Sequence, residues 1–183
     1  MILPIVAYGD PLLRKKGQQI TKDYPKLKHL IENMFETLAD ADGIGLAAHQ
    51  VGHPIMLFIT DASVIGEGFE DFRKVFINAQ IEESGDEWDK EEGCLSIPKV
   101  YEHVKRPSKL KIKYYDEHFE YHEEEYEGMK ARIIQHEFDH NNGVLFIDHL
   151  TPLKKTLIKG KLNDITKGKV DVEYKMRFAP SRK

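Results

Sequence analysis

The chain has 183 residues, of which 40% are hydrophobic and 32% are charged, and its formal net charge is −4 at pH 7. This length and apolar content suit one domain, so we expect residues 1–183 to share a single core. The slight acidic excess argues against specific DNA binding, and no apolar run reaches the roughly 18 residues that a membrane span requires. In residues 1–16 the charges follow the apolar part, the reverse of a signal peptide, and we therefore expect a cytoplasmic protein.

The first half of the chain predicts one amphipathic helix and two strands. Residues 25–41 predict a helix because apolar residues recur at helical spacing, and Gly43 is placed to end it. Residues 55–60, "IMLFIT", predict a buried strand, and residues 74–82, "KVFINAQIE", predict another. The apolar stripe of the helix consists of Leu27, Leu30, Ile31, Met34, Phe35 and Leu38.

The second half predicts a hairpin, two helices and a final strand. Residues 109–115 alternate between polar and apolar and can pair with residues 119–126 across a turn. Residues 128–141 predict a second helix, and residues 152–167 predict a third. The alternation of residues 169–176, "KVDVEYKM", predicts a last strand. Hairpins rather than regular βαβ units indicate an α+β fold with mixed or antiparallel sheets.

The motif "QHEFDH", at residues 135–140, predicts a metal site on the second helix. Residues four apart project from the same side of a helix, so His136 and His140 can offer imidazole nitrogens to one ion. Glu137 lies one step round the helix, where its carboxylate can reach a water on that ion without binding the ion. The alternative is a helix that carries two histidines by chance, in a chain with nine histidines. On the first interpretation, the sheets pack around a central metal-binding helix.

A third ligand must come from outside this motif. Proteases that extend the motif place a histidine where this chain has Phe146, which has no lone pair for a metal. Other proteases take the third ligand from a glutamate on a later helix, but Glu173, the main downstream candidate, lies in a predicted exposed strand. Asp139 would crowd a tetrahedral site, so we expect it to orient a ligand or the local backbone. Cys94, in "EEGCLSIP" at residues 91–98, would complete a Cys-His-His set with one open position, which is typical of a catalytic site.

Other interpretations of these residues stay open at this point. As the single cysteine of the chain, Cys94 is also compatible with a buried structural residue or a nucleophile. A structural zinc site would need a fourth protein ligand, for which His53, His103 and His149 are the candidates. A metalloendopeptidase would need a histidine or glutamate as third ligand, against which Phe146 argues.

The segment "GIGLAAHQ", at residues 43–50, also matches the glycine pattern of dinucleotide-binding proteins. That pattern must follow a strand and open a helix, whereas here it follows a predicted helix, and we reject this interpretation. The segment is then either a turn leading into a core strand or a site where Gly43 and Gly45 let the backbone approach a ligand closely. In the second case Gln50 supplies an amide donor to a substrate oxygen.

Together, "GIGLAAHQ", "EGCLS" and "QHEFDH" resemble the three signature segments of the peptide deformylases, in the same order and at similar separations. The opening "ILPIVAYGDPLLRKK" is also similar to the N-terminus of that family, so the resemblance covers most of the chain and implies one catalytic domain over residues 1–183. The family consists of small α+β hydrolases that remove the N-formyl group from nascent polypeptides. The resemblance therefore implies formyl-methionyl nascent polypeptides as substrates and formate as a product.

The resemblance also implies roles for the motif residues. It implies Glu137 as the general acid and base, and Gln50 and the backbone N–H of Leu95 as donors to the oxyanion. In the family the native metal is typically Fe²⁺, and Zn²⁺, Ni²⁺ or Co²⁺ can occupy the site. The implied ligands of this one divalent metal ion are Cys94, His136 and His140.

Substrate contacts are expected around the metal helix, where apolar side chains can line a pocket for methionine. For Met129 and Ile133, ordinary core packing is the alternative. Arg132 is interpreted as a partner of Glu92, a substrate contact or a surface residue. Transient ribosome contact is implied by the substrate class alone, although lysines make residues 154–169 locally basic. The expected substrate contacts are Ile44, Gly45, Gly93, Met129 and Ile133.

Overall fold

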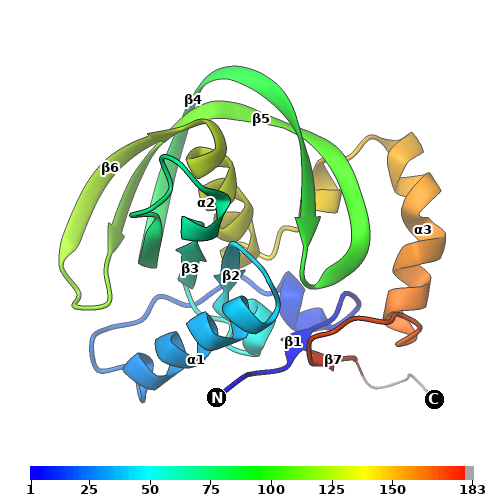
Figure 1. Cartoon of the computed structure of the whole chain (residues 1–183), viewed down its shortest axis with the longest axis horizontal. Coiled ribbons are helices and arrows are strands. Elements are labelled where there is room, and N and C mark those ends of the chain that lie inside the picture. Colours follow the sequence, from blue (N-terminus) through cyan, green and yellow to red (C-terminus); the bar gives the residue numbers. More distant parts are fainter. Residues whose placement is uncertain (180–183) are drawn as a thin grey trace.

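The computed structural model describes residues 1–179, and these residues form three α-helices, seven strands and four short 3-10 helices (Figure 1). The α-helices are α1 (Leu27–Asp40), α2 (Gly128–Asn141) and α3 (Pro152–Thr166). The strands are β1 (Ile5–Val6), β2 (Gly45–Ala47), β3 (Leu57–Asp61), β4 (Arg73–Cys94), β5 (Ile97–Tyr115), β6 (Tyr121–Glu127) and β7 (Met176–Arg177). The 3-10 helices are η1 (Pro11–Arg14), η2 (Ala48–Val51), η3 (Ser63–Ile65) and η4 (Phe146–His149).

One antiparallel sheet of five strands, in the order β2-β3-β4-β5-β6, forms most of the framework. β1 and β7 come from opposite ends of the described chain and form a separate parallel pair. Helix α2 lies in the middle of the molecule with the sheet curving around it, whereas α1 and α3 lie at the outside (Figure 1). This arrangement confirms the predicted α+β fold with mixed and antiparallel sheets around a central helix.

The β4–β5 hairpin is much longer than the sequence predicted, because β4 continues to Cys94 and β5 begins at Ile97. Apart from the half-buried Trp88, residues 83–91 are charged or small and exposed, so they show no alternation of apolar residues. Backbone pairing rather than a buried face therefore holds them as a strand. Shifts of register interrupt the ladder at three places, and the hairpin bends into an arch (Figure 1).

Helix α1 confirms the predicted range and packs its apolar stripe on the sheet. Leu30, Met34 and Leu38 are buried in one core cluster with residues of β2, β3 and β4. The chain leaves the helix through Asp42, whose φ of 53° lies in the left-handed region. The backbone N–H of Gly43 then donates to the Leu38 carbonyl at 3.0 Å, and this turn leads directly into β2.

Helix α2 covers the predicted residues 128–141 and has two different faces. Ala131 and Ile134 are fully buried against aromatic and aliphatic side chains of β3, β4 and β5. The opposite side carries His136 and His140 toward the end of β4. The apolar face thus fixes the rotation of the helix, and with it the direction in which the histidines point.

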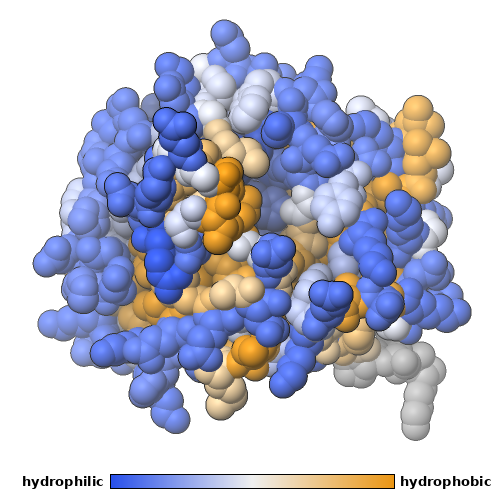
Figure 2. Space-filling model, in the orientation of Figure 1, coloured by the Kyte–Doolittle hydropathy of each residue, from blue (hydrophilic) through white to orange (hydrophobic). Residues whose placement is uncertain are grey.

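Helix α3 confirms the third predicted helix and begins with a capping side chain. The Thr151 hydroxyl accepts from the Lys154 N–H at 3.4 Å. Leu153 and Leu157 remain 70% and 71% exposed, and Figure 2 shows apolar atoms over the start of this helix on an otherwise mostly hydrophilic face. Among residues 1–179, no helix is long and apolar enough to span a bilayer.

The predicted strand at residues 169–176 is wrong for most of its length. Only Met176 and Arg177 pair, with β1, and the residues before them run without a strand partner. The alternation is nevertheless real, because every second side chain from Val170 to Met176 is half-buried and those between are exposed. An extended segment lying along a protein surface produces the same pattern as a half-buried strand.

Candidate metal centre

Helix α2 and the end of β4 bring three metal-binding side chains together. The ring centroids of His136 and His140 lie 5.2 Å apart, and Cys94 Sγ lies 3.3 Å from His140 Nε2. One donor atom from each of the three residues lies within 4.8 Å of the others. A thiolate and two imidazoles at this spacing fit a divalent transition metal, and three protein ligands leave a position for water.

Glu137 lies next to this group and is almost completely buried, with 4% of its surface exposed. Its Oε2 atom has no hydrogen-bond partner among the described residues. Burial raises the pKa of this carboxyl to about 7, although the nearby His136 acts in the opposite direction. A buried carboxyl with a pKa near neutrality can accept and return a proton.

Gly45 provides the space that Glu137 occupies. A Cβ atom at position 45 would lie 2.8 Å from the Glu137 Cδ atom, which is closer than two carbons can approach. β2, which begins at Gly45, therefore runs directly beside the carboxyl of α2. The lack of a side chain at Gly45 thus allows a close approach to the Glu137 carboxyl, whereas the predicted backbone approach to a ligand stays a prediction.

Gln50, in η2, is buried and turns its amide nitrogen toward Cys94. Its Oε1 accepts from the Ala47 N–H at 2.9 Å, which fixes the orientation of the amide. Its Nε2 donates to Ser96 Oγ at 3.3 Å and approaches Cys94 Sγ to 3.5 Å. An amide N–H is thus held rigidly beside the metal-binding group, where it can reach a ligand in the same space.

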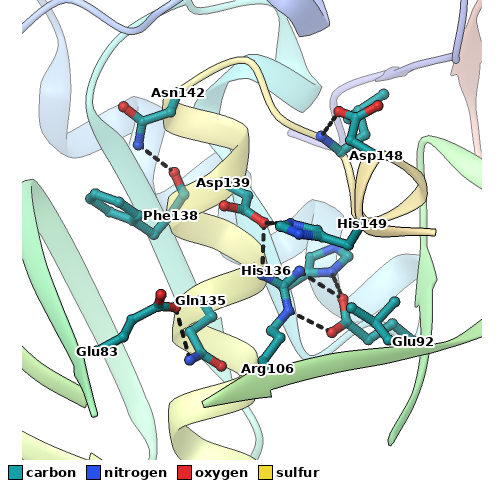
Figure 3. A network of polar contacts seen from close by, with 12 residues as sticks. Glu83, Glu92, Arg106, Gln135, His136, Phe138, Asp139, Asn142, Asp148 and His149 are labelled. Carbon is teal, nitrogen blue, oxygen red and sulfur yellow. Dashed lines mark hydrogen bonds and ion pairs between the residues drawn. The ribbon is translucent and has the colours of Figure 1, made fainter. Parts of the chain in front are cut away.

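A buried ionic network that includes Glu92 and Arg106 contacts His136 of this group (Figure 3). His136 Nδ1 lies 2.9 Å from Glu92 Oε2, and the same carboxylate accepts two hydrogen bonds from Arg106, at 2.7 and 3.0 Å. Arg132 adds a contact to Glu92 at 2.8 Å, which selects the first of its three interpretations. Burial alone would raise the pKa of Glu92, but the hydrogen bonds from His136 and Arg106 outweigh it and hold that pKa below its ordinary value.

Asp139 belongs to the same network and does not join the three ligand candidates. Its Oδ2 accepts from Arg106 at 2.7 Å and lies 2.8 Å from His149 Nε2. It therefore acts on His136 only through Arg106 and Glu92. Arg106 was not predicted from the sequence, because nothing in the local pattern links a residue of β5 to Glu92 on the neighbouring strand.

A cavity of 730 Å³ opens onto Cys94, His136 and Glu137. Its lining includes every expected substrate contact, and also Gln50 and Leu95. Residues 171–174 also line the cavity, which was not predicted, because their alternation indicated an extended segment but not its neighbours. The expected contacts in the lining are Ile44, Gly45, Gly93, Met129 and Ile133.

The candidates for a fourth protein ligand contact other side chains instead. His53 lies 3.3 Å from the Tyr24 hydroxyl, and His103 lies 3.1 Å from a carboxylate oxygen of Asp89. His149 lies beside Asp139, and Phe146 stacks on His136 with centroids 6.0 Å apart. Within residues 1–179 the group around Cys94 thus has three members, the number typical of a catalytic site.

Comparison with known proteins agrees with this geometry. A family model described as polypeptide deformylase matches residues 2–156. A peptide deformylase from Christiangramia forsetii is 54% identical, over 100% of this chain and 99% of the relative, and one from Cytophaga hutchinsonii is 52% identical, over 97% and 98%. A crystal structure of peptide deformylase from Plasmodium falciparum has a TM-score of 0.83 at 38% identity, covering 90% of this chain and 95% of its own. The chain therefore belongs to the polypeptide deformylase family.

Proposed function

We propose that this hydrolase removes the N-formyl group from formyl-methionyl polypeptides at a divalent metal held by Cys94, His136 and His140. Family membership makes the chain a peptide deformylase, and the reaction converts a formamide and water into formate and a free α-amine. One observation supports these site residues most directly. Buried Glu137, whose Oε2 atom has no hydrogen-bond partner among the described residues, lines the same cavity as Cys94 and His136, and His140 completes their group of donor atoms.

The metal is the proposed cofactor, with Fe²⁺ as the native ion and Zn²⁺, Ni²⁺ or Co²⁺ as alternatives. All four ions accept one thiolate and two imidazoles. When bound, the ion supplies Lewis acidity, which makes water a better nucleophile at neutral pH and polarises a carbonyl. The contact between Glu92 and His136 Nδ1 supports this assignment, because a second partner on the imidazole is typical of metal-ligating histidines.

The protein's own groups supply positioning and proton transfer. Glu137 takes a proton from the attacking water and returns it to the departing amine. Gln50 Nε2 and the backbone N–H of Leu95 donate to the oxygen on which negative charge develops. The hydrogen bond that the Ala47 N–H donates to Gln50 Oε1 supports this role, because it holds the amide in place before the substrate arrives.

The methionine side chain would be bound by the apolar part of the cavity. Ile44, Met129 and Ile133 present apolar surface, and Gly45 and Gly93 expose backbone at which an extended peptide can lie. We also propose that residues 1–183 act as one catalytic domain. The pairing of β1 with β7 supports this, because it joins the two ends of the described chain.

The substrate class implies action where translation takes place, and thus a cytoplasmic enzyme with transient access to the ribosome. The lysine-rich region from residue 154 to residue 169 supports such contact, because ribosomal surfaces are rich in phosphate.

The test is formate release from formyl-Met-Ala-Ser by protein loaded separately with Fe²⁺, Zn²⁺, Ni²⁺ and Co²⁺. We expect activity in at least one form, and we expect Cys94→Ser and His140→Ala to lose both the metal and the activity. His29→Ala, which changes an exposed histidine outside the cavity, is the matched control. Bound metal without formate release in any form would instead favour a structural metal site.

A further inference from the structure

Residues 171–174 form one wall of the catalytic cavity. Asp171, Val172, Glu173 and Tyr174 line the same space as Glu137, a buried residue whose Oε2 atom has no hydrogen-bond partner among the described residues. The family model matches the chain only as far as residue 156, so this wall lies outside the matched part.

Two sets of contacts fix the wall in place. The Tyr174 hydroxyl donates to the Leu95 carbonyl at 2.8 Å, directly beside the metal-ligand candidate Cys94. β7 begins two residues after Tyr174 and pairs with β1, and the N–H of Tyr8, two residues after β1, donates to the Ser96 carbonyl at 2.8 Å. The segment is therefore tied at its C-terminal end to the turn that follows Cys94, which gives Tyr174 a defined position at the cavity.

The mouth of the cavity is strongly acidic. Among its exposed lining residues, Lys99 is the only cation within the described part of the chain. Arg132 also lines the cavity, but Glu92 neutralises its charge. Exposed carboxylates belong to five lining residues, none of which forms a salt bridge with any residue of 1–179: Asp40, Asp42, Glu91, Asp171 and Glu173.

We infer that residues 171–174 are a specificity-determining wall, at which Asp171 and Glu173 favour substrates with cationic side chains after the formyl-methionine and disfavour acidic ones. The inference rests on the proposed function, since it assumes that formyl-methionine enters this cavity. The residues that follow must then leave across the mouth, where unpaired carboxylates attract positive charge and repel negative charge. Tyr174 is a positioning residue, because its hydrogen bond holds the two carboxylates at the mouth.

The test compares kcat/KM for formyl-Met-Lys-Lys and formyl-Met-Glu-Glu at low and high salt. For the wild type at low salt, we expect the lysine peptide to be favoured by about tenfold, and we expect added salt to reduce that ratio. The double variant Asp171→Asn/Glu173→Gln should reduce the ratio by about threefold or more. The matched control Glu67→Gln/Glu117→Gln removes the same charge at exposed positions outside the cavity and should preserve the ratio.

Tyr174→Phe separates a positioned wall from the general negative charge of the protein. This variant keeps both carboxylates and loses only the hydrogen bond to Leu95, so the ratio should fall while the net charge stays constant. The inference is overturned if the wild-type ratio is near one, or if the double variant keeps the wild-type ratio.

Binding of both peptides to metal-loaded Glu137→Gln, measured by calorimetry, separates this inference from the proposed function. Selective binding without turnover by the wild type would contradict the proposed function and support a role of residues 171–174 in specificity. Turnover by the wild type with equal binding of the two peptides would contradict only the role of residues 171–174 in specificity.

Discussion

Nδ1 of His136 lies 2.9 Å from Oε2 of Glu92, a carboxylate that is 7% exposed. Because this contact occupies one ring nitrogen, the other is free on the side of Cys94 and His140. The carboxylate also accepts from Arg106 and Arg132, so three positively charged or polar partners meet on one buried group. The orientation of a proposed metal ligand thus depends on the same ions that hold β4, β5 and α2 together.

Glu92→Gln should weaken both metal binding and folding. Without the negative charge, buried Arg132 loses its ion pair and Arg106 keeps only Asp139, and we expect the free energy of unfolding to fall by about 3–5 kcal/mol. Loss of the partner of His136 should weaken metal affinity by about ten- to a hundredfold. Denaturant titration and metal competition measure the two effects. Glu87→Gln, at an exposed position of the same strand, should change neither.

Glu137→Gln should abolish most of the activity and leave the metal bound. The amide has nearly the same shape but cannot accept the proton from water, and we expect kcat to fall by about a hundred- to ten-thousandfold. Formate release and metal content, measured on the same sample, check this. A variant with wild-type kcat would show that another group carries the proton.

Gln50→Ala tests the proposed oxyanion donor. Removal of one such donor typically costs about 3–4 kcal/mol in the transition state, so kcat should fall by roughly a hundredfold or more, with a smaller change in KM. Gln80→Ala, at an exposed position of β4, is the control and should keep the wild-type kcat. A loss confined to KM would indicate that Gln50 binds the ground state instead.

Gly45→Ala should reduce activity through a steric effect on Glu137. The added Cβ would lie 2.8 Å from Glu137 Cδ, so the carboxyl must move from its position in the cavity. Gly160→Ala is the opposite case, since a Cβ there meets no atom within 4 Å inside α3. We expect this control to keep its activity and to stabilise the fold by about 0.5–1 kcal/mol, because alanine favours helix. Steady-state kinetics and thermal unfolding distinguish the two outcomes.

Protonation of Glu124 should lower the free energy of unfolding in the acid pH range. Burial acts to raise its pKa, but hydrogen bonds from Lys74, Tyr126 and Tyr114 outweigh it and lower the pKa below the ordinary 4.5. Its stabilising effect is therefore fully present above about pH 4.5 and is lost as the pH falls through the lower folded pKa. The difference in free energy of unfolding between wild type and Glu124→Gln should shrink over that range. Glu125→Gln, which removes the same charge at the exposed neighbouring position, is the matched control.

Local patterns were sufficient to predict the three helices and the grouping of Cys94, His136 and His140. The i, i+3, i+4 spacing of α1 and the spacing of His136 and His140 are properties of a single helix turn, and they hold wherever the helix packs. The pairing of residues 109–115 with β6 was also predictable, because a short turn forces neighbouring strands together. Elimination on chemical grounds led to Cys94, since Phe146 cannot bind a metal.

Only the tertiary structure decided what surrounds those residues. The exposed half of the β4–β5 hairpin is a strand because its backbone has a partner, and no apolar pattern records that partner. Arg106 reaches Glu92 and Asp139 through the register of two strands and the rotation of α2, which are set by contacts far apart in the chain. Tyr174 reaches Leu95 across 79 positions for the same reason. The sequence by itself determined which chemical groups are present and which of them share a helix face. Long-range packing determined the partners of these groups, and contacts between distant segments leave no local periodicity from which the partners could be predicted.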